Sequence, residues 1–475
     1  MITKSYFIKS PWLGYNTVWR WHFYAGLFCM PFIVLLAVTG AIYLFKPQFE
    51  AYQEAAYQVK ANEKVPQSVT SQALAAVKVL PHAQFNAYQL PASPQSPAHV
   101  MLIYQGELRR VLVNPYTLQV MNVATEEDRF MPWIHRLHGR LLMGDKGSYL
   151  VELAASWAIV MIVTGLFLWW PRDAKGLAGV LYPRLHIASG QPLSGKVARR
   201  IFWRDLHAVI GFWIALFVLF LLISGLPWTK SWGGLLKEVR QFGATSQTQI
   251  KQDWFTSQKE LQEANSMLAP GEEHAHHRHD RQLTADIPEQ TVLPASLDTM
   301  VRNVAGLQLP PPVMIAAPSR RNAGWVGKSD TQHRPSRVTV NLDPQNGAIL
   351  SRTNFEDKPM LDRVVGYGVA VHEGQLFGWF NQLLGLLTAL GLVAVVVSGV
   401  VMWLRRRQAS TLGAPFAQTR LNTRMPVATV VATVLLAILL PFLGLSLIAV
   451  LMVERLVLVY LPKVAQFLGL PARTT

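Results

Sequence analysis

Long apolar runs alternate with polar stretches along this chain. Four of the runs are long enough to cross a membrane as helices, because about 20 apolar residues span the hydrocarbon core. They are roughly 21–45, 149–170, 206–228 and 377–404. A last apolar region, about 426–461, is too long for one span and is interrupted at Pro441. We expect it to form a hairpin of two short spans, and one tilted span followed by an interfacial helix is the alternative.

The long polar segments between the runs contain strand-like alternation. Segment 46–148 contains the pattern Arg110–Thr117, and segment 229–376 contains the pattern Val338–Gly347. In both, β-branched residues lead into an Asn-Pro or Asp-Pro turn, which is typical of a β-hairpin. We therefore predict a small α+β domain in each segment.

Basic residues gather in two of the shorter loops, 171–205 and 405–425. Lys and Arg beside membrane spans favour the cytoplasmic side. We therefore expect both loops and the N-terminus inside and the two long polar segments outside. The expected order is N-terminus and span 1 (1–45), outer domain 1 (46–148), span 2 (149–170), inner loop (171–205), span 3 (206–228), outer domain 2 (229–376), span 4 (377–404), inner loop (405–425), and apolar hairpin with tail (426–475).

Composition supports a multi-pass membrane protein. Of the 475 residues, 51% are hydrophobic and 15% are charged, which is too apolar for an ordinary soluble protein. The net charge is +16, and its arginine clusters follow the apolar runs instead of forming a separate basic domain. No nucleic-acid partner is therefore expected. Cys29 is the one cysteine. It excludes an intramolecular disulfide framework, a CxxCH haem site and a cysteine-ligated iron–sulfur cluster.

Two spacings between a histidine and a glycine each occur twice. The members of one pair are 18 residues apart, and those of the other are 27 apart. The pairs are His22 with Gly40 and His207 with Gly225, then His138 with Gly165 and His372 with Gly399. Thr or Ser precedes each of the four glycines. We interpret this pattern as an internal duplication, and it singles out four of the 13 histidines.

Histidines at membrane depth are costly and usually functional. Interfacial histidines bonded to backbone or lipid headgroups, metal transport and proton relay are the alternatives. Bis-histidine haem ligation fits better, because neutral imidazoles are good axial ligands and a flat macrocycle fits between helices. Glycine at a helix face permits the close approach that such a macrocycle requires.

The helical rise decides how the histidines pair. Eighteen helical residues span about 27 Å, close to one hydrocarbon thickness. His22 and His207 are therefore expected near the cytoplasmic face, and His138 and His372 at the outer boundary. The sequence predicts an inner haem between the first two and an outer haem between the last two, stacked across the bilayer.

His135 is the rival of His138 as an outer ligand, since it lies three residues earlier on one possible helix face. Its counterpart in the second half is Val369, which argues for a supporting role instead. His274, His276, His277 and His279 form a cluster in a polar insertion. Such a tract can bind metal loosely, but a solvated loop is the favoured interpretation.

Four arginines flank the predicted haem ligands. Arg20 and Arg204 could pair with the propionates of the inner haem, and Arg136 or Arg140 with those of the outer one. A role as ordinary membrane-flanking charges explains them equally well.

Three motifs, Trp133–Gly139, Thr164–Arg172 and His372–Gly378, resemble the PepSY-associated transmembrane helix family of bacteria. The turns at Asn114 and Asp343 are similar to the Asp-Pro-x-Thr-Gly turn of PepSY domains. The resemblance covers about residues 15–410. It implies a membrane α-helical bundle with two periplasmic α+β PepSY-like domains, in the bacterial inner membrane.

The resemblance also implies an activity. Some members of the family look like ferric-siderophore reductases with two b-type haems. The expected function is thus electron transfer from a cytoplasmic donor, a reduced flavin or flavoprotein, to a periplasmic ferric siderophore. The alternatives are a non-enzymatic regulatory or assembly protein and a siderophore or metal uptake permease.

Overall fold

A computed structural model describes residues 15–60, 65–171, 176–184, 195–242, 296–318, 324–407, 411–415 and 427–469. The chain divides into two compact units. The helical unit comprises 1–42, 136–247 and 383–475, and the sheet unit comprises 43–135 and 248–382.

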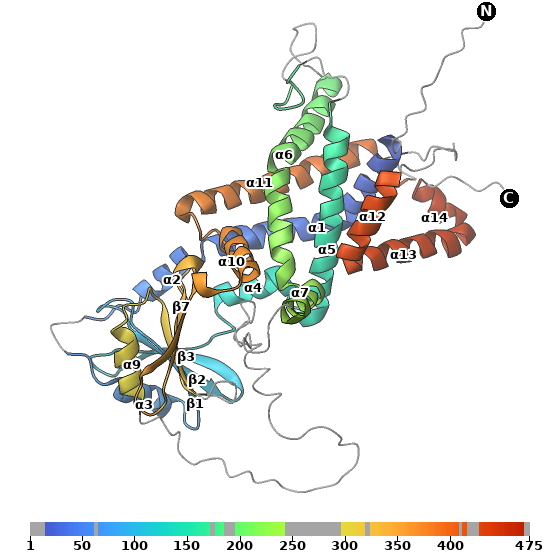
Figure 1. Ribbon diagram of the computed structural model, residues 1–475. Coiled ribbons are helices and arrows are strands. Elements are labelled where there is room, and N and C mark those ends of the chain that lie inside the picture. Colours follow the sequence, from blue (N-terminus) through green and yellow to red (C-terminus); the bar gives the residue numbers. More distant parts are fainter. Residues whose placement is uncertain are drawn as a thin grey trace, which may run out of the picture. The chain divides into compact units, whose positions relative to one another are not determined.

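Four long apolar helices dominate the helical unit (Figure 1). They are α1 (Tyr15–Leu44), α5 (Gly144–Trp169), α6 (Gly195–Gly225) and α11 (Gly378–Arg406). Among the described residues these are the helices long and apolar enough to cross a membrane, α6 together with the 3₁₀ turn η1 (Leu226–Trp228). All four predicted spans are therefore confirmed as candidate spans.

The C-terminal apolar region forms two helices that break at the predicted place. They are α12 (Val427–Leu439) and α13 (Pro441–Leu456), followed by η4 (Leu458–Tyr460) and α14 (Pro462–Phe467). Proline at the first helical position starts a new helix, because it has no N–H to donate to the preceding turn. Leu440 and Leu443 at the break pack with Ile159 of α5. With 13 and 16 residues, α12 and α13 are shorter than a straight span, so their crossing of a membrane stays a prediction.

A carboxylate that the sequence analysis left out fixes the short helix α7 (Lys230–Phe242). Glu152 lies within α5, and 1% of its surface is exposed. Its Oε2 accepts hydrogen bonds from the backbone N–H groups of Ser231 (3.1 Å) and Trp232 (3.4 Å). Because the first N–H groups of a helix have no partner within it, a carboxylate there satisfies them and meets the positive end of the dipole.

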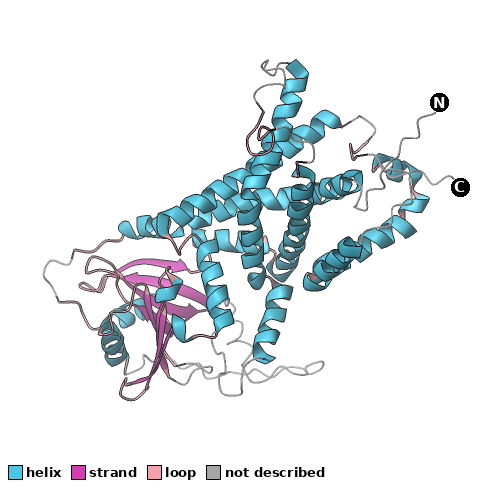
Figure 2. Cartoon of the chain, turned by 45° about the horizontal axis from the view of Figure 1, so that its top comes forward, coloured by secondary structure: helices cyan, strands magenta, loops and turns pink. Residues whose placement is uncertain are grey.

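The sheet unit contains one antiparallel sheet of eight strands in the order β4-β3-β2-β1-β5-β6-β7-β8 (Figure 2). The strands are β1 (Gln84–Gln89), β2 (Ala98–Tyr104), β3 (Glu107–Val113), β4 (Val120–Thr125), β5 (Val313–Ala316), β6 (Trp325–Ser329), β7 (Val338–Leu342) and β8 (Ile349–Asn354). Two 3₁₀ turns, η2 (Arg334–Ser336) and η3 (Phe355–Asp357), flank β7 and β8.

Both predicted hairpins are present, as β3–β4 and β7–β8. In the first turn Oδ1 of Asn114 accepts from the N–H groups of Tyr116 (2.9 Å) and Thr117 (3.2 Å). In the second, Oδ1 of Asp343 accepts from the N–H groups of the residues two and three positions later. These side chains replace backbone acceptors, which is why Asn and Asp favour such turns.

The expectation of two separate outer domains needs correction. β1 pairs with β5, with Tyr88 opposite Ile315, so the two polar segments share one sheet. Two helices, α3 (Val69–Val79) and α9 (Leu297–Ala305), cover the same face and enclose a common core that includes Ala76, Met300 and Trp325. Separate domains would each leave β1 or β5 as an unpaired edge, and the pairing removes both edges.

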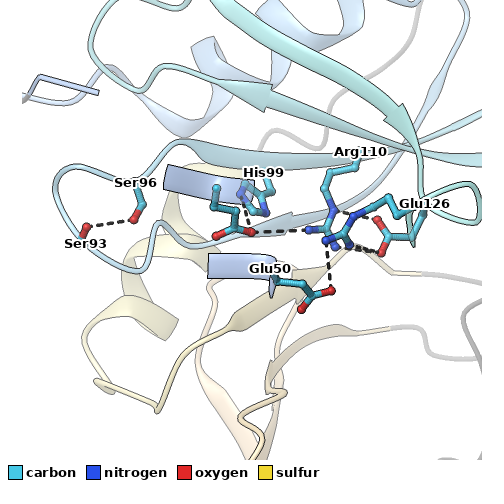
Figure 3. A network of polar contacts seen from close by, with 8 residues as sticks. Glu50, Ser93, Ser96, His99, Arg110 and Glu126 are labelled. Carbon is cyan, nitrogen blue, oxygen red and sulfur yellow. Dashed lines mark hydrogen bonds and ion pairs between the residues drawn. The ribbon is translucent and has the colours of Figure 1, made fainter. Parts of the chain in front are cut away.

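The opposite face of the sheet meets α2 (Lys46–Ala55) through a network of charges (Figure 3). Arg110 lies 2.8 Å from Glu126, and Arg129 bridges Glu126 (2.7 Å) and Glu50 of α2 (3.2 Å). The ring of His99 lies beside this network, 3.8 Å from the carboxylate of Glu54. Charge pairing thus attaches α2 to Arg110 of β3 and to Arg129, and His99 of β2 lies beside these pairs.

The element order confirms the internal duplication. The first half runs α1, α3, β1–β4, α4 (Phe130–Arg140) and α5, and the second runs α6, α9, β5–β8, α10 (Met360–His372) and α11. Apart from α2 in the first half and η1, α7, η2 and η3 in the second, each half therefore consists of a long helix, a helix with four strands, a shorter helix and a second long helix.

Candidate functional site

Two of the four repeated histidines meet inside the helical unit. His22 is on α1 and His207 is at the matching position on α6. Their ring centroids are 6.2 Å apart, and the ring planes are nearly perpendicular, at 87°. The rings therefore face one another across a narrow gap without stacking.

Both rings are held by the same arrangement on a neighbouring long helix. Nδ1 of His22 is 3.1 Å from the carbonyl oxygen of Met161 and 3.1 Å from Oγ1 of Thr164, on α5. Nδ1 of His207 is 2.9 Å from the carbonyl oxygen of Val395 and 3.2 Å from Oγ of Ser398, on α11. In each case Nδ1 is the ring nitrogen that the neighbouring helix engages.

The glycines of the repeat are the places where the histidine rings lie. A Cβ built on Gly165 would be 3.1 Å from Cε1 of His22, and one on Gly399 would be 3.5 Å from Cε1 of His207. A Cβ at Gly165 would crowd the ring of His22, whereas one at Gly399 would make ordinary contact with the ring of His207. The Thr/Ser-Gly step is thus a seat for an imidazole on another helix.

His138, on α4, occupies a third seat of this kind. Its Nδ1 is 2.9 Å from Oγ1 of Thr39, and a Cβ on Gly40 would be 3.3 Å from its Cε1. The helix α1 contributes His22 and the Thr39 seat. The segment formed by α4 and α5 contributes His138 and the Thr164 seat, so each of the two holds the histidine of the other. In the first half this exchange explains why His22 and His138 each lie at a fixed distance from a glycine of their own segment.

The fourth repeated histidine belongs to the other unit. His372 is the last residue of α10, in the sheet unit, whereas His138 is in the helical unit. The predicted pairing of these two residues stays a prediction. The rival ligand His135 is also in the sheet unit, where its ring centroid is 5.4 Å from that of Tyr43.

His22 and His207 line a cavity of about 1780 Å³ between the long helices. Gly26 and Gly211, each four residues after one of these histidines, also line it. A Cβ on Gly211 would meet nothing within 4 Å, and one on Gly26 would meet Sδ of Met161 at 3.5 Å. The missing side chains widen the cavity beside both rings.

One end of this cavity is lined by cations. They are Arg184, Lys196, Arg199, Arg200, Arg204, Arg405 and Arg406. The buried carboxylate of Asp205, which does not itself line the cavity, forms ion pairs with Arg184 (2.6 Å) and Arg204 (2.9 Å). The guanidinium of Arg406 lies over the ring of Trp19, 4.8 Å from its centroid.

The predicted arginines are used unequally. Arg204 lines the cavity, whereas Arg20 is not among its lining residues. Arg20 donates to the carbonyl oxygens of Pro415 (2.6 Å) and Gly469 (2.8 Å). Arg136 and Arg140 both lie on α4, and their role beside an outer haem stays a prediction.

Metal-binding clusters are not found among the described residues, in which no three His, Cys, Asp or Glu side chains gather around a common point. The histidine-rich tract with His274, His276, His277 and His279 lies outside the described residues. The candidate site is therefore the cavity with its two facing imidazoles.

Sequence reasoning found the histidines but missed their supports. It recorded Thr39, Thr164 and Ser398 as residues before glycines and gave their hydroxyl groups no role. It also missed Arg406 and the buried Asp205. The repeated Thr/Ser-Gly step was the available signal for the hydroxyl groups, because a residue type that recurs at matching positions of a duplication is under a shared physical demand.

Comparison with known proteins adds one finding to this geometry. The family described as the PepSY-associated TM region matches residues 19–406. A search of curated proteins gave no match. The matched range begins just before His22 and ends at Arg406, so it includes every cavity residue named above.

Proposed function

Because the chain belongs to the family with the PepSY-associated TM region, we propose that it is a di-haem electron-transfer protein of the membrane that reduces a ferric chelate. The chelate is of the ferric-siderophore class and lies outside the cytoplasm. The donor is a reduced flavin or flavoprotein in the cytoplasm. The observation that carries this proposal is the spacing of the rings of His22 and His207.

That spacing suits two imidazoles on opposite sides of one iron. A bond from an imidazole nitrogen to a metal is about 2 Å long, so two such bonds plus the two ring radii give about 6 Å between centroids. The centroids of His22 and His207 are 6.2 Å apart. Their Nδ1 atoms are already bonded to α5 and α11, which leaves Nε2 of each ring as the nitrogen that would bind a metal.

The surroundings of the two rings also suit a haem. The cavity has apolar walls and is widened by Gly26 and Gly211 beside the rings. Arg204 and Arg406 line it and could pair with propionates. A bound haem would supply a one-electron couple between ferric and ferrous iron. The chain's residues hold and orient the ligands, supply counter-charges and exclude water.

The second haem is proposed from the repeat, with His138 and His372 as ligands. His138 supports it, because Thr39 and Gly40 seat its ring as Thr164 and Gly165 seat that of His22. Along α1, 18 residues separate His22 from Gly40, which is about 27 Å of helix. Two haems at these depths would carry an electron across most of a hydrocarbon core.

The proposed orientation rests on charge. The cationic end of the cavity contains Arg199 and Arg200 from the start of α6, and Arg405 from the end of α11. Arginines beside spans favour the cytoplasm. The His22–His207 pair would thus serve the cytoplasmic side, and the sheet unit would lie in the periplasm of a bacterial inner membrane.

Haem content of purified variants tests the ligands. We expect the parent protein to bind two haems with a reducible bis-imidazole spectrum. His22→Ala or His207→Ala should lose one haem, and His138→Ala or His372→Ala should lose the other. A parent protein without haem would contradict the proposal and favour a regulatory protein or a permease. Retention of both haems in His22→Ala would refute the inner ligand pair.

A second variant fills the cavity without removing a ligand. In Gly211→Leu the new side chain should occupy the open space beside His207 and exclude the inner haem, while the helix gains propensity. Gly234→Leu is the matched control, because a Cβ there also meets nothing within 4 Å and Gly234 does not line the cavity. Equal haem content in the two variants would contradict the proposed position.

A further inference from the structure

The cationic end of the cavity carries more charge than a haem can use. Seven of the described residues that line the cavity are basic, and none of those described lining residues is acidic. Asp205, behind the lining, neutralises part of the charge of Arg184 and Arg204. Asp205 and two propionates together offset three of the seven cations. At least four of these positive charges therefore remain without a counter-charge from the part of the chain that the structure describes.

The surplus cations are accessible. Lys196, Arg199 and Arg200 are exposed on the first turns of α6, and Arg405 is exposed on the last turn of α11. Like charges gathered in a concave, low-dielectric site repel one another and attract a polyvalent anion. An anionic ligand would thus find a preformed site here.

Flat aromatic rings lie in the same cavity. Trp169 stacks on Phe212 with centroids 4.0 Å apart and planes at 12°. The indole N–H groups of Trp169 and Trp403 donate to the carbonyl oxygens of Val180 (3.0 Å) and Leu412 (2.8 Å). These bonds fix both indoles, and all three rings line the cavity. Fixed aromatic walls favour a planar ligand, because little side-chain freedom is lost on binding.

We propose that this end of the cavity is a binding site for a flavin that carries a phosphate group, of the flavin mononucleotide class. Lys196, Arg199 and Arg200 would hold the phosphate, and the aromatic walls would hold the ring system. This inference rests on the proposed function and names its electron donor. The two anionic oxygens of a phosphate monoester suit several cations better than one carboxylate does.

A flavin also suits the electron count. The reduced flavin loses two electrons and two protons and becomes the oxidised flavin, while two ferric chelates each gain one electron and become ferrous. The protons leave on the side where the flavin is bound. A nicotinamide gives up its electrons as a hydride and therefore needs an acceptor for the pair.

Equilibrium dialysis of oxidised flavin mononucleotide against the full chain in neutral-lipid nanodiscs tests the site. Riboflavin has the same ring system and no phosphate, so we expect it to bind at least tenfold more weakly. In Arg199→Gln/Arg200→Gln the affinity for flavin mononucleotide should fall about tenfold and that for riboflavin should not change. Arg352→Gln, an exposed arginine of β8 in the sheet unit, is the control and should bind as the parent does.

Haem absorbance of the same samples separates the two proposals. An unchanged haem spectrum with equal binding of the two flavins would overturn the flavin site and leave the proposed function standing. Phosphate-dependent binding in a chain without haem would support the site and refute the proposed function. Nanodiscs with anionic lipid identify the other source of phosphate. If that lipid abolishes flavin binding, the cations hold headgroups and the flavin site is overturned; retained binding supports it.

Discussion

At the scale of single residues, the hydrogen bonds of His22 decide which ring nitrogen carries the hydrogen. The carbonyl oxygen of Met161 can only accept, so Nδ1 of His22 must carry a hydrogen. Oγ1 of Thr164 donates to the carbonyl oxygen of Val160 (2.8 Å) and is left as a second acceptor for that N–H. The lone pair is therefore on Nε2, the nitrogen that a metal would need.

Removing one of these two acceptors should weaken the proposed ligand without removing it. In Thr164→Val we expect the inner haem to dissociate about tenfold more readily, because outer hydrogen bonds contribute that much to metal affinity. The reduction potential of that haem should rise, since a less basic imidazole stabilises ferric iron less. Redox titration with absorbance measures both. Thr388→Val is the control: Thr388 bonds back to its own helix α11 and does not line the cavity. Identical potentials in the two variants would show that the hydroxyl group has no such role.

For this site the sequence predicted only how far along a membrane-spanning helix each histidine and glycine lies. The 18-residue spacing placed His22 and Gly40 at opposite ends of one span, and the structure agrees. It could not show that His22 contacts Gly165 and Thr164, because spacing along one helix says nothing of which neighbour it packs against. The supporting hydroxyl groups depend on that neighbour and stayed without a role.

At the scale of elements, we expect the stability of the sheet beside α2 to depend on pH. Burial, helped by the positive charges of Arg110 and Arg129, lowers the pKa of His99 to about 3 from 6.5. The ring is therefore neutral at pH 7, and its 3.8 Å contact with Glu54 is not an ion pair there. Burial also raises the pKa of Glu54, although Arg110 opposes that rise.

Acid should therefore loosen the sheet unit before it protonates His99 in the folded state. Below pH 6.5 the unfolded chain binds a proton at His99 that the folded chain refuses until about pH 3. Stability from this group is complete above pH 6.5 and is lost as the pH falls. Between pH 7 and pH 5 we expect a loss of about 2 kcal/mol. Hydrogen exchange of the β2 amides, corrected for intrinsic rates, measures it.

Two variants of this network give opposite results. His99→Gln should remove the loss between pH 7 and pH 5. Glu54→Gln should steepen it, because a carboxyl with a raised folded pKa gains stability as the pH falls and so offsets His99 in the parent chain. The same pH dependence in His99→Gln as in the parent would assign the effect to other groups.

The predictability of elements followed the sequence distance of their contacts. The turns at Asn114 and Asp343 were predictable, because each side chain bonds to N–H groups two and three residues away. The break before Pro441 was predictable for the same local reason. The pairing of β1 with β5 joins distant segments, and no local pattern distinguishes it from two separate sheets.

At the scale of the whole molecule, the duplicated halves are joined within the sheet unit by β1 and β5. The strand order is symmetrical about this pair, with β1–β4 on one side and β5–β8 on the other. The N–H of Leu90 donates to the carbonyl oxygen of Val313 (2.9 Å) and extends the pairing beyond the strands. Each half thus supplies the partner for an edge that the other half would otherwise expose.

A fragment of residues 1–184 should therefore associate with itself. Its β1, Gln84–Gln89, carries no charged residue that would block pairing of two copies. Because β1 pairs antiparallel with its repeat counterpart, two copies of β1 should pair in the same way. We expect a dimer by light scattering in detergent, and a monomer for Leu90→Pro, which lacks the N–H. A monomeric parent fragment would show that α3 and the strands protect the edge by themselves.

The shared sheet also fixes the order in which its two central strands are synthesised and can pair. A ribosome completes β1 through β4 long before it reaches β5. The uncharged edge of β1 therefore has no partner strand while two further long helices, α5 and α6, enter the membrane. Unpaired strand edges are where nascent chains aggregate. The unpaired edge of β1 is therefore the point at which a chaperone would act. Any stall in translation between α5 and β5 would leave an incomplete chain whose β1 edge can pair with other chains.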